Sequence, residues 1–185
     1  MIYFLYIPLA ALNLLITFGI AYPFAFVLPI FAKPMLGWCD NHAYEAIEPR
    51  LPTWMSWLMT PDNSLNGDAT FQKLNPPSFL SQGKWLWRNP NYAFAIKYLT
   101  YPYVGKVSGD KTIRDNDNAK AGWCFVRVNG LFLFRYIKRI PFTNCCVLGN
   151  MGWNIMGTVD DNVQPKPLIW QATFACTPFR LSGFK

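Results

Sequence analysis

The N-terminal stretch of residues 2–32 constrains this chain more than any other, because it contains no charged side chain. An apolar run of 18 or more residues is typical of a transmembrane helix, since about 20 helical residues cross the roughly 30 Å hydrocarbon core of a bilayer. No other stretch of the 185 residues is both as long and as apolar. The sequence therefore predicts an N-terminal anchor over 1–32, followed by a domain held at a membrane.

Prolines set the expected shape of this anchor. Pro8 suits a first helical turn, and Pro23 lies where a helix bends or stops. We expect one main helix over 9–28, kinked near Pro23. Asn13 and Thr17 lie four residues apart on one helix face, either as a polar seam for a partner helix or as two locally satisfied groups.

Two other interpretations of the apolar stretch stay open. A cleaved signal peptide requires positive charge before the apolar run, whereas no basic side chain precedes Lys33 here, which favours an uncleaved anchor. The other alternative is an apolar segment that a virus particle buries against protein. If the segment spans a membrane, the placement of all 17 Lys and Arg residues after it predicts an outside N-terminus and cytoplasmic residues 33–185.

Composition limits the compartment and the partners. Five cysteines, an odd number, do not indicate a disulfide framework and fit a reducing cytosol. A net charge of +7 suits anionic lipid or nucleic acid. Aromatic residues make up 17% of the chain, so many rings must be packed in a core, set in a membrane interface or covered by a partner.

Residues 33–53 are expected to form a connector, with a possible short helix over 42–48, and residues 54–185 a single α+β domain. In its first half we expect three helices and a polar loop: helices over 54–59 (N-capped by Thr53), 78–88 (ended by Asn89-Pro90) and 91–101, and the loop over 105–120. The predicted fold class is thus an N-terminal transmembrane helix followed by a small domain of short helices and an antiparallel β-meander.

The clearest local pattern is a β-hairpin over Gly122–Val128 and Leu131–Arg139, joined by the structural turn Asn129-Gly130. Asn-Gly provides the positive φ values of a type I′ turn, and the turn sets the register. One face carries five rings: Trp123, Phe125, Phe132, Phe134 and Tyr136. The other carries Val126, Val128, Leu131 and Leu133. Because both faces are apolar, we expect both to be covered. Further strands are expected over 145–154 and 168–176.

Two groups of residues are candidates for metal binding or catalysis. Asp62, Ser64, Asn66 and Asp68 resemble the first half of a calcium loop, but Lys73 occupies the position of the bidentate glutamate. This favours an Asx-rich turn that caps the preceding short helix. Cys39 and His42 form an isolated Cys-x-x-His pair, without the second pair that zinc usually requires. A thiol nucleophile at Cys39 would depend on His42, the single histidine. We expect no enzyme, metal or cofactor.

Aromatic and basic residues that follow the anchor predict a membrane-interface surface. Its members are Trp54, Trp57, Trp85, Trp87, Tyr98, Arg88 and Lys97. Such residues favour the headgroup zone and anionic lipid. The alternative is that these rings complete the core over the sheet. For nucleic acid, the candidates are Arg127, Arg135, Lys138 and Arg139 near the hairpin rings. The regular pairing of the rings favours a core instead.

Several short motifs resemble an uncharacterised group of membrane-associated proteins encoded by tailed bacteriophages. They are Thr60-Pro61-Asp62 with Leu65 and Gly67-Asp68, Trp87-Arg88-Asn89-Pro90, Gly152-Trp153-Asn154, and Pro178-Phe179-Arg180 with Gly183-Phe184. The resemblance implies a phage origin and no catalytic residue. Physically, the motifs are typical of a turn, a helix break and a strand bend.

Together these observations predict a phage-encoded, membrane-anchored accessory protein at the host inner membrane. It would act in the infected cell through a host or phage protein, for example in superinfection exclusion or inhibition of a host system. Anionic lipid and a homo-oligomer are further expected partners, and nucleic acid is not favoured. The alternative is a structural or DNA-delivery protein of the virion, whose apolar N-terminus is buried or inserts into the membrane.

Overall fold

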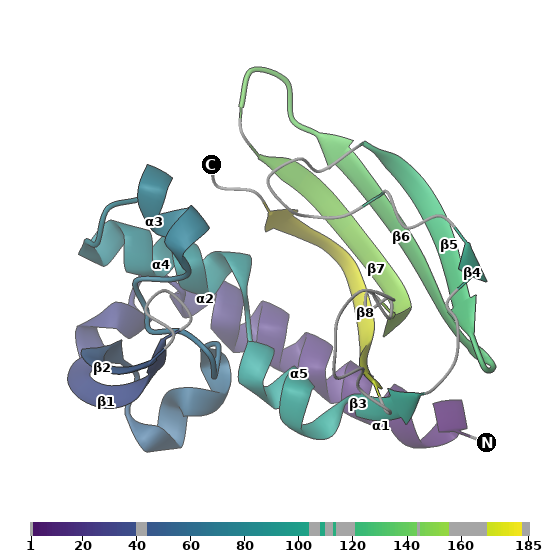
Figure 1. Ribbon diagram of the computed structural model, residues 1–185, viewed down its shortest axis with the longest axis horizontal. Coiled ribbons are helices and arrows are strands. Elements are labelled where there is room, and N and C mark those ends of the chain that lie inside the picture. Colours follow the sequence, from purple (N-terminus) through teal and green to yellow (C-terminus); the bar gives the residue numbers. More distant parts are fainter. Residues whose placement is uncertain are drawn as a thin grey trace. The chain divides into compact units, whose positions relative to one another are not determined.

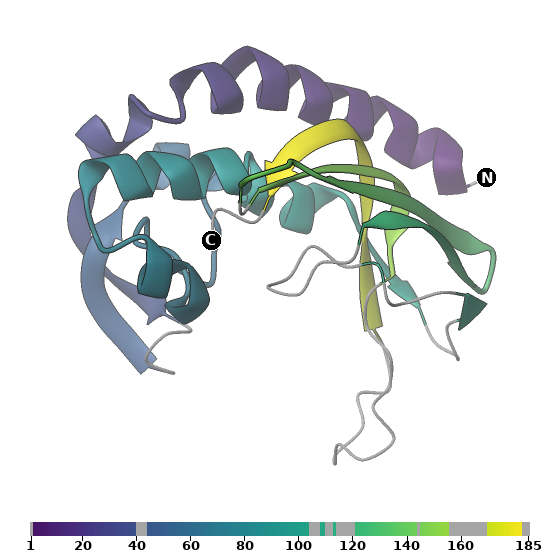
Figure 2. The ribbon, with the colours of Figure 1, turned by 90° about the horizontal axis from the view of Figure 1, so that it is seen from above.

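The computed structural model describes residues 2–39, 44–103, 108–109, 113, 121–143, 145–155 and 170–182. Its helices and strands are shown from two directions in Figure 1 and Figure 2. The chain divides into two compact units. Unit 1 comprises residues 1–10 and 95–183, and unit 2 comprises residues 11–94 and 184–185. Short helices and antiparallel sheets follow an N-terminal apolar helix, so the predicted α+β class with a β-meander is confirmed.

The N-terminal helix is longer and less regular than expected. It consists of α1 (Ile2–Ile16), the π-helical turn η1 (Thr17–Ala21) and α2 (Tyr22–Phe24), followed by the 3₁₀ turn η2 (Leu28–Phe31). Pro8 lies inside α1 rather than in its first turn. The α-helical ladder is interrupted just before Pro23, where the Tyr22 N–H bonds to the Thr17 carbonyl. A proline ring excludes the carbonyl four residues earlier, which explains the widened turn at this place.

Unit 2 contains a two-stranded sheet in place of the predicted connector. Strands β1 (Lys33–Cys39) and β2 (Tyr44–Arg50) pair antiparallel, and the suggested helix over 42–48 is therefore wrong. Arg50, which ends β2, is buried and donates to the carbonyls of Trp38 and Asn63. Its guanidinium lies so close to Gly37 that a Cβ there would come within 2.5 Å of Arg50 Nε. A tertiary contact thus stabilises a hairpin that local propensity does not indicate.

Short helices form the rest of unit 2. The predicted helix 54–59 is the 3₁₀ helix η3 (Thr53–Leu58), preceded by Pro52 instead of a Thr53 cap. The helix predicted over 78–88 is confirmed as α4 (Phe79–Arg88), capped by a reciprocal Ser78–Ser81 capping box. Helix α3 (Ala69–Leu74) was not expected. The buried core of the unit consists of Ala21, Ala25, Leu28, Leu51, Met55, Leu58, Met59, Leu65 and Leu86.

A six-stranded antiparallel sheet forms unit 1, in the order β3-β8-β7-β6-β5-β4. Its strands are β3 (Thr100–Tyr103), β4 (Ser108–Gly109), β5 (Gly122–Val128), β6 (Leu131–Arg139), β7 (Cys146–Asn154) and β8 (Trp170–Ser182), labelled in Figure 1. Helix α5 (Tyr92–Tyr98) ends earlier than predicted because β3 begins at Thr100 and pairs with β8. The predicted strand 168–176 is longer and reaches Ser182.

The predicted hairpin is confirmed in position and register. Val128 pairs with Leu131 and Trp123 with Tyr136. Asn129 and Gly130 adopt φ values of 45° and 78°, as a type I′ turn requires. The loop predicted over 105–120 lies outside the described residues, except for Ser108–Gly109 in β4 and Ile113.

Within the described part of the chain only one face of this hairpin is covered, which contradicts the expectation of two covered faces. Val126, Val128, Leu131 and Leu133 are buried in a cluster with residues from α1 and β8. The opposite face is exposed, including all five rings: Trp123, Phe125, Phe132, Phe134 and Tyr136. Alternation along a strand correctly separates the two faces, but it does not show whether another element covers each of them.

Gly152 adopts a backbone conformation within β7 that requires the absence of a side chain. Its φ is +105°, and a Cβ at this position would lie 2.3 Å from the Phe132 carbonyl oxygen of β6. The glycine of the motif Gly152-Trp153-Asn154 therefore has a steric explanation, whereas the irregular pairing of β7 with β8 lies between Leu148 and Asn150.

We expect Gly152→Ala to lower the free energy of unfolding by roughly 1–3 kcal/mol, because alanine meets both an unfavourable φ and a backbone oxygen. Thermal unfolding of the detergent-solubilised full chain measures the effect. Gly19→Ala is the control, since Gly19 is helical and has no neighbour within 4 Å of an added Cβ. A Gly152→Ala variant as stable as Gly19→Ala would contradict this account.

Candidate functional site

The N-terminal helix exposes a continuous apolar surface. By length and composition, Phe4–Phe24 is able to cross a membrane, and only 17% of its most apolar window is buried. A signal sequence can have the same length and apolar composition, and so can a core helix, although core helices are mostly buried. We give the name outward face to the following exposed apolar side chains of this helix and of the turns that follow it to Phe31: Phe4, Leu5, Ile7, Leu12, Leu15, Phe18, Ile20, Phe24, Val27, Ile30 and Phe31. No charged side chain lies among them, so this surface is suited to lipid or to an apolar partner.

The opposite side of the helix packs on folded protein, and in unit 1 this contact is made by Tyr6. Its hydroxyl donates to the Thr100 carbonyl over 2.8 Å. Its ring lies 4.8 Å from Trp153, with the two planes at 69°. Trp153 is fully buried and also meets Phe174 of β8 edge-on. The first turns of the helix are thus attached to the sheet of unit 1.

In unit 2 the same helix is attached by a polar contact and an aromatic contact. Asn91 is completely buried and donates through Nδ2 to Asn13 Oδ1 over 2.7 Å. The Tyr22 ring lies 4.9 Å from that of Trp87 in α4. Thr17 is buried as well. The seam of Asn13 and Thr17 predicted from spacing therefore faces this chain, and Asn13 has its partner there.

The predicted membrane-interface residues differ in how far their side chains are exposed. Trp54 is 71% exposed, and Tyr98 and Lys97 are exposed as a pair, with Lys97 Nζ 5.3 Å from the Tyr98 ring centroid. Trp57 and Trp87 are partly buried against the core of unit 2.

The prediction that Trp85 lies at the membrane interface is wrong, because its side chain is only 4% exposed. Its indole N–H donates to Thr60 Oγ1 over 3.3 Å. It belongs to the core, where it supports Arg88, whose Cζ lies 5.6 Å from its ring centroid. Membrane contact therefore remains a prediction for the accessible residues only.

A second apolar surface lies on the sheet of unit 1. We call it the aromatic face, and it consists of Trp123, Phe125, Phe132, Phe134, Tyr136 and Met151. Trp123 is 69% exposed. The rings stack across the strands, with centroids 6.0 Å apart for Phe125 and Phe132 and 6.3 Å for Trp123 and Phe134. Register places Met151 opposite Phe134, which extends the surface onto β7.

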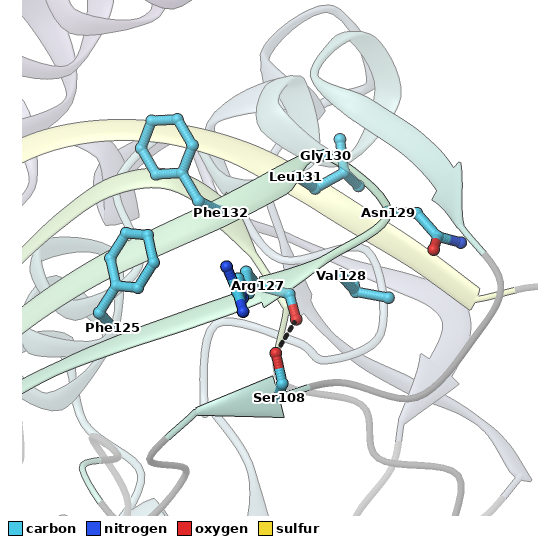
Figure 3. A pocket seen from close by; sticks show the side chains of 8 residues that line it. All are labelled: Ser108, Phe125, Arg127, Val128, Asn129, Gly130, Leu131 and Phe132. Atoms are coloured by element: carbon cyan, nitrogen blue, oxygen red, sulfur yellow. Dashed lines mark hydrogen bonds between the residues drawn. The ribbon is translucent and has the colours of Figure 1, made fainter.

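A pocket of about 450 Å³ lies at the hairpin end of this face (Figure 3). Phe125, Arg127 and Phe132 line it, and the Ser108 hydroxyl donates to the Arg127 carbonyl over 3.2 Å. The remaining lining residues are Val128, Asn129, Gly130 and Leu131. The pocket thus combines aromatic surface with one cationic side chain. No Asp or Glu occurs between residues 118 and 159.

The oxygen-rich turn serves the fold of unit 2. Asp68 Oδ1 accepts from the Phe71 N–H over 2.7 Å and caps α3, so the turn caps the following helix rather than the preceding one. Ser64 and Asn66 both donate to the Glu48 carboxylate. Within the described ranges, no group of three or more His, Cys, Asp or Glu side chains could hold a metal ion. Asp62, the remaining candidate of this turn, does not complete such a group.

Five cysteines lie in the described ranges, and none of them forms a disulfide: Cys39, Cys124, Cys145, Cys146 and Cys176. Cys39 is buried, and its predicted partner His42 lies outside the described residues.

Sequence reasoning missed a buried arginine on the covered face of the sheet. Arg135 is 1% exposed and donates from Nε to Asn150 Oδ1 over 2.7 Å and from Nη2 to Asn154 Oδ1 over 2.8 Å. Its position between Leu133 and Ile137 in the alternating strand was the available signal. Of the predicted nucleic-acid residues, Arg127, Lys138 and Arg139 are exposed and Arg135 is not.

We expect Asn150→Ala to lower the free energy of unfolding by about 1–3 kcal/mol, because it removes an acceptor from a buried cation. Chemical denaturation of the full chain measures the change. Lys138 is an exposed cation on β6, the strand of Arg135. The free energy of unfolding of Lys138→Met should stay within about 0.5 kcal/mol of that of the natural chain. Equal effects of the two variants would show that the Asn150 contact does not stabilise the sheet.

Comparison with known proteins places the chain by sequence alone. No curated protein and no solved structure matches it. One family model, described as a family of unknown function (DUF7338), matches residues 1–182. Because this match extends over almost the whole chain, the protein belongs to the DUF7338 family, whose function is unknown.

Proposed function

We propose that this protein is a membrane-bound accessory protein that acts by binding another protein through its aromatic face. The observation that carries the proposal is the exposure of stacked rings on one side of the sheet in unit 1. Contiguous exposed apolar surface on a folded protein marks an interaction site. The outward face of the N-terminal helix supports attachment to a membrane.

The chemistry of the aromatic face favours a protein partner. Trp, Tyr, Phe, Met and Arg are the residue types enriched at the centres of protein interfaces, and all occur here. Cross-strand stacking holds the rings in place before binding, so little side-chain entropy is lost when the partner arrives. Arg127 adds a cation beside Phe125 and Phe132, which favours a partner with an acidic group at this end.

The setting of the proposal is the cytoplasmic side of a host inner membrane during phage infection. The phage origin rests on the motif resemblance, including Trp87-Arg88-Asn89-Pro90. Superinfection exclusion or inhibition of a host system suits a membrane-bound protein that occupies a host or phage partner. Trp54, Tyr98 and Lys97 are the accessible residues proposed to contact anionic lipid.

Cross-linking from the aromatic face tests the proposal. A photoreactive phenylalanine analogue at Phe134 in infected cells should give a distinct protein adduct, whereas the analogue at Phe79, an exposed phenylalanine of α4, should not. An adduct of twice the chain mass would indicate a second copy, and a nuclease-sensitive adduct would indicate nucleic acid and contradict the proposal. Many copies in purified virions would instead favour the virion alternative.

The double variant Phe125→Ala with Phe132→Ala should weaken binding of the cross-linked partner at least tenfold, since central interface rings contribute about 2 kcal/mol or more. Affinity measured with the isolated partner checks this. Folding stability should fall by no more than about 1.5 kcal/mol for this exposed pair. Phe79→Ala is the matched control, and equal affinity of both variants would exclude the aromatic face as the binding site.

A further inference from the structure

The mode of membrane attachment follows from which sides of the N-terminal helix are occupied. A helix that spans a bilayer alone is surrounded by lipid over its hydrophobic length. Here each unit packs against its own part of the helix, unit 1 at Tyr6 and unit 2 at Asn13 and Tyr22. These contacts lie near both ends and in the middle of Phe4–Phe24.

The contacts of Tyr6 are incompatible with a position on the far side of a membrane. Tyr6 donates to Thr100 at the start of β3, which is an edge strand of an open sheet. Open sheet edges do not occur within the hydrocarbon region, because their backbone groups have no partners there. The same sheet exposes Arg127 and Lys138, which are costly to place in lipid.

The contacts further along the helix lead to the same result. Tyr22 packs against Trp87, which is followed directly by Arg88 and Asn89 at the end of α4. A spanning helix would bring either these residues or the sheet bonded to Tyr6 into the bilayer. A helix lying along the surface brings neither into it.

The polar side chains of the helix and its apolar outward face are also separated. The Tyr6 hydroxyl and the Asn13 amide are hydrogen-bonded within their own units and Thr17 is buried, whereas the outward face is apolar from Phe4 to Phe31. Interfacial helices bury one apolar face about 5–10 Å into the headgroup and acyl boundary. Lys33, exposed directly after the segment, suits an anionic headgroup.

We propose that the N-terminal helix lies in the plane of the membrane, with its outward face inserted into one leaflet and both ends of the chain on the same side. This inference rests on the membrane attachment in the proposed function and specifies its geometry. It departs from the single span with an outside N-terminus that charge placement predicts.

Depth measurements along the outward face test this geometry. Spin labels are placed singly at Leu5, Leu15 and Ile30, each at least 67% exposed, in the full chain bound to preformed phosphatidylethanolamine–phosphatidylglycerol vesicles. An in-plane helix should give three similar, shallow depths of about 5–10 Å. A spanning helix should place Leu15 near the bilayer centre, about 15 Å deep, and the other two near opposite surfaces.

Sidedness provides an independent readout. A fluorophore at Phe4 and one at Phe179 should both be quenched by an impermeant reagent outside the vesicles, whereas a spanning helix protects the one at Phe4. Leu15→Lys should weaken vesicle binding at least tenfold, and Leu74→Lys, at an exposed leucine of α3, should not. A chain that does not float with vesicles overturns both proposals. Binding with a protected Phe4 label or a deep Leu15 label overturns only the in-plane geometry.

Discussion

Burial of one side of an uncharged helix is the constraint on which the rest of this structure depends. The N-terminal helix carries Tyr6, Asn13 and Tyr22 on the side that packs against folded protein, and each unit contributes its own partner. An apolar helix alone has no preferred side, whereas these groups select one because their hydroxyl, amide and ring find specific contacts. The apolar outward face is what remains after this choice.

Features that local chemistry determines were predictable from the sequence. Asn129 and Gly130 set the hairpin register, and Ser78 begins α4, because a turn or cap needs only neighbouring residues. The β1–β2 sheet was not predictable, since its Arg50 contacts come from burial within unit 2. The same limit explains Trp54 and Trp85, which look equivalent in sequence but differ in whether a core forms around them.

The candidate surfaces show a similar division. Strand alternation identified which hairpin side chains share a face, yet exposure of the aromatic face depends on the absence of a covering element among the described parts of the fold. Arg127 and Arg135 illustrate the point on neighbouring strands. One lies at an exposed pocket between rings, and the other is held by Asn150 and Asn154 beneath the sheet. Their difference follows from alternation within each strand, because Arg127 shares the exposed face with Phe125 whereas Arg135 shares the buried face with Leu133 and Ile137. Charge alone does not distinguish them.

The sequence separation of the contacts around Tyr6 has a consequence for synthesis. Tyr6 leaves the ribosome well before its partners, because its bond to Thr100 joins residues 94 positions apart and its ring also meets Phe174. At a synthesis rate of about 5–20 residues per second, the residues that pack against Tyr6 are made on the order of ten seconds after it. During that interval both sides of the helix are open to chaperones and to the membrane. The sheet of unit 1 is therefore completed around a helix that has been uncovered since early in synthesis.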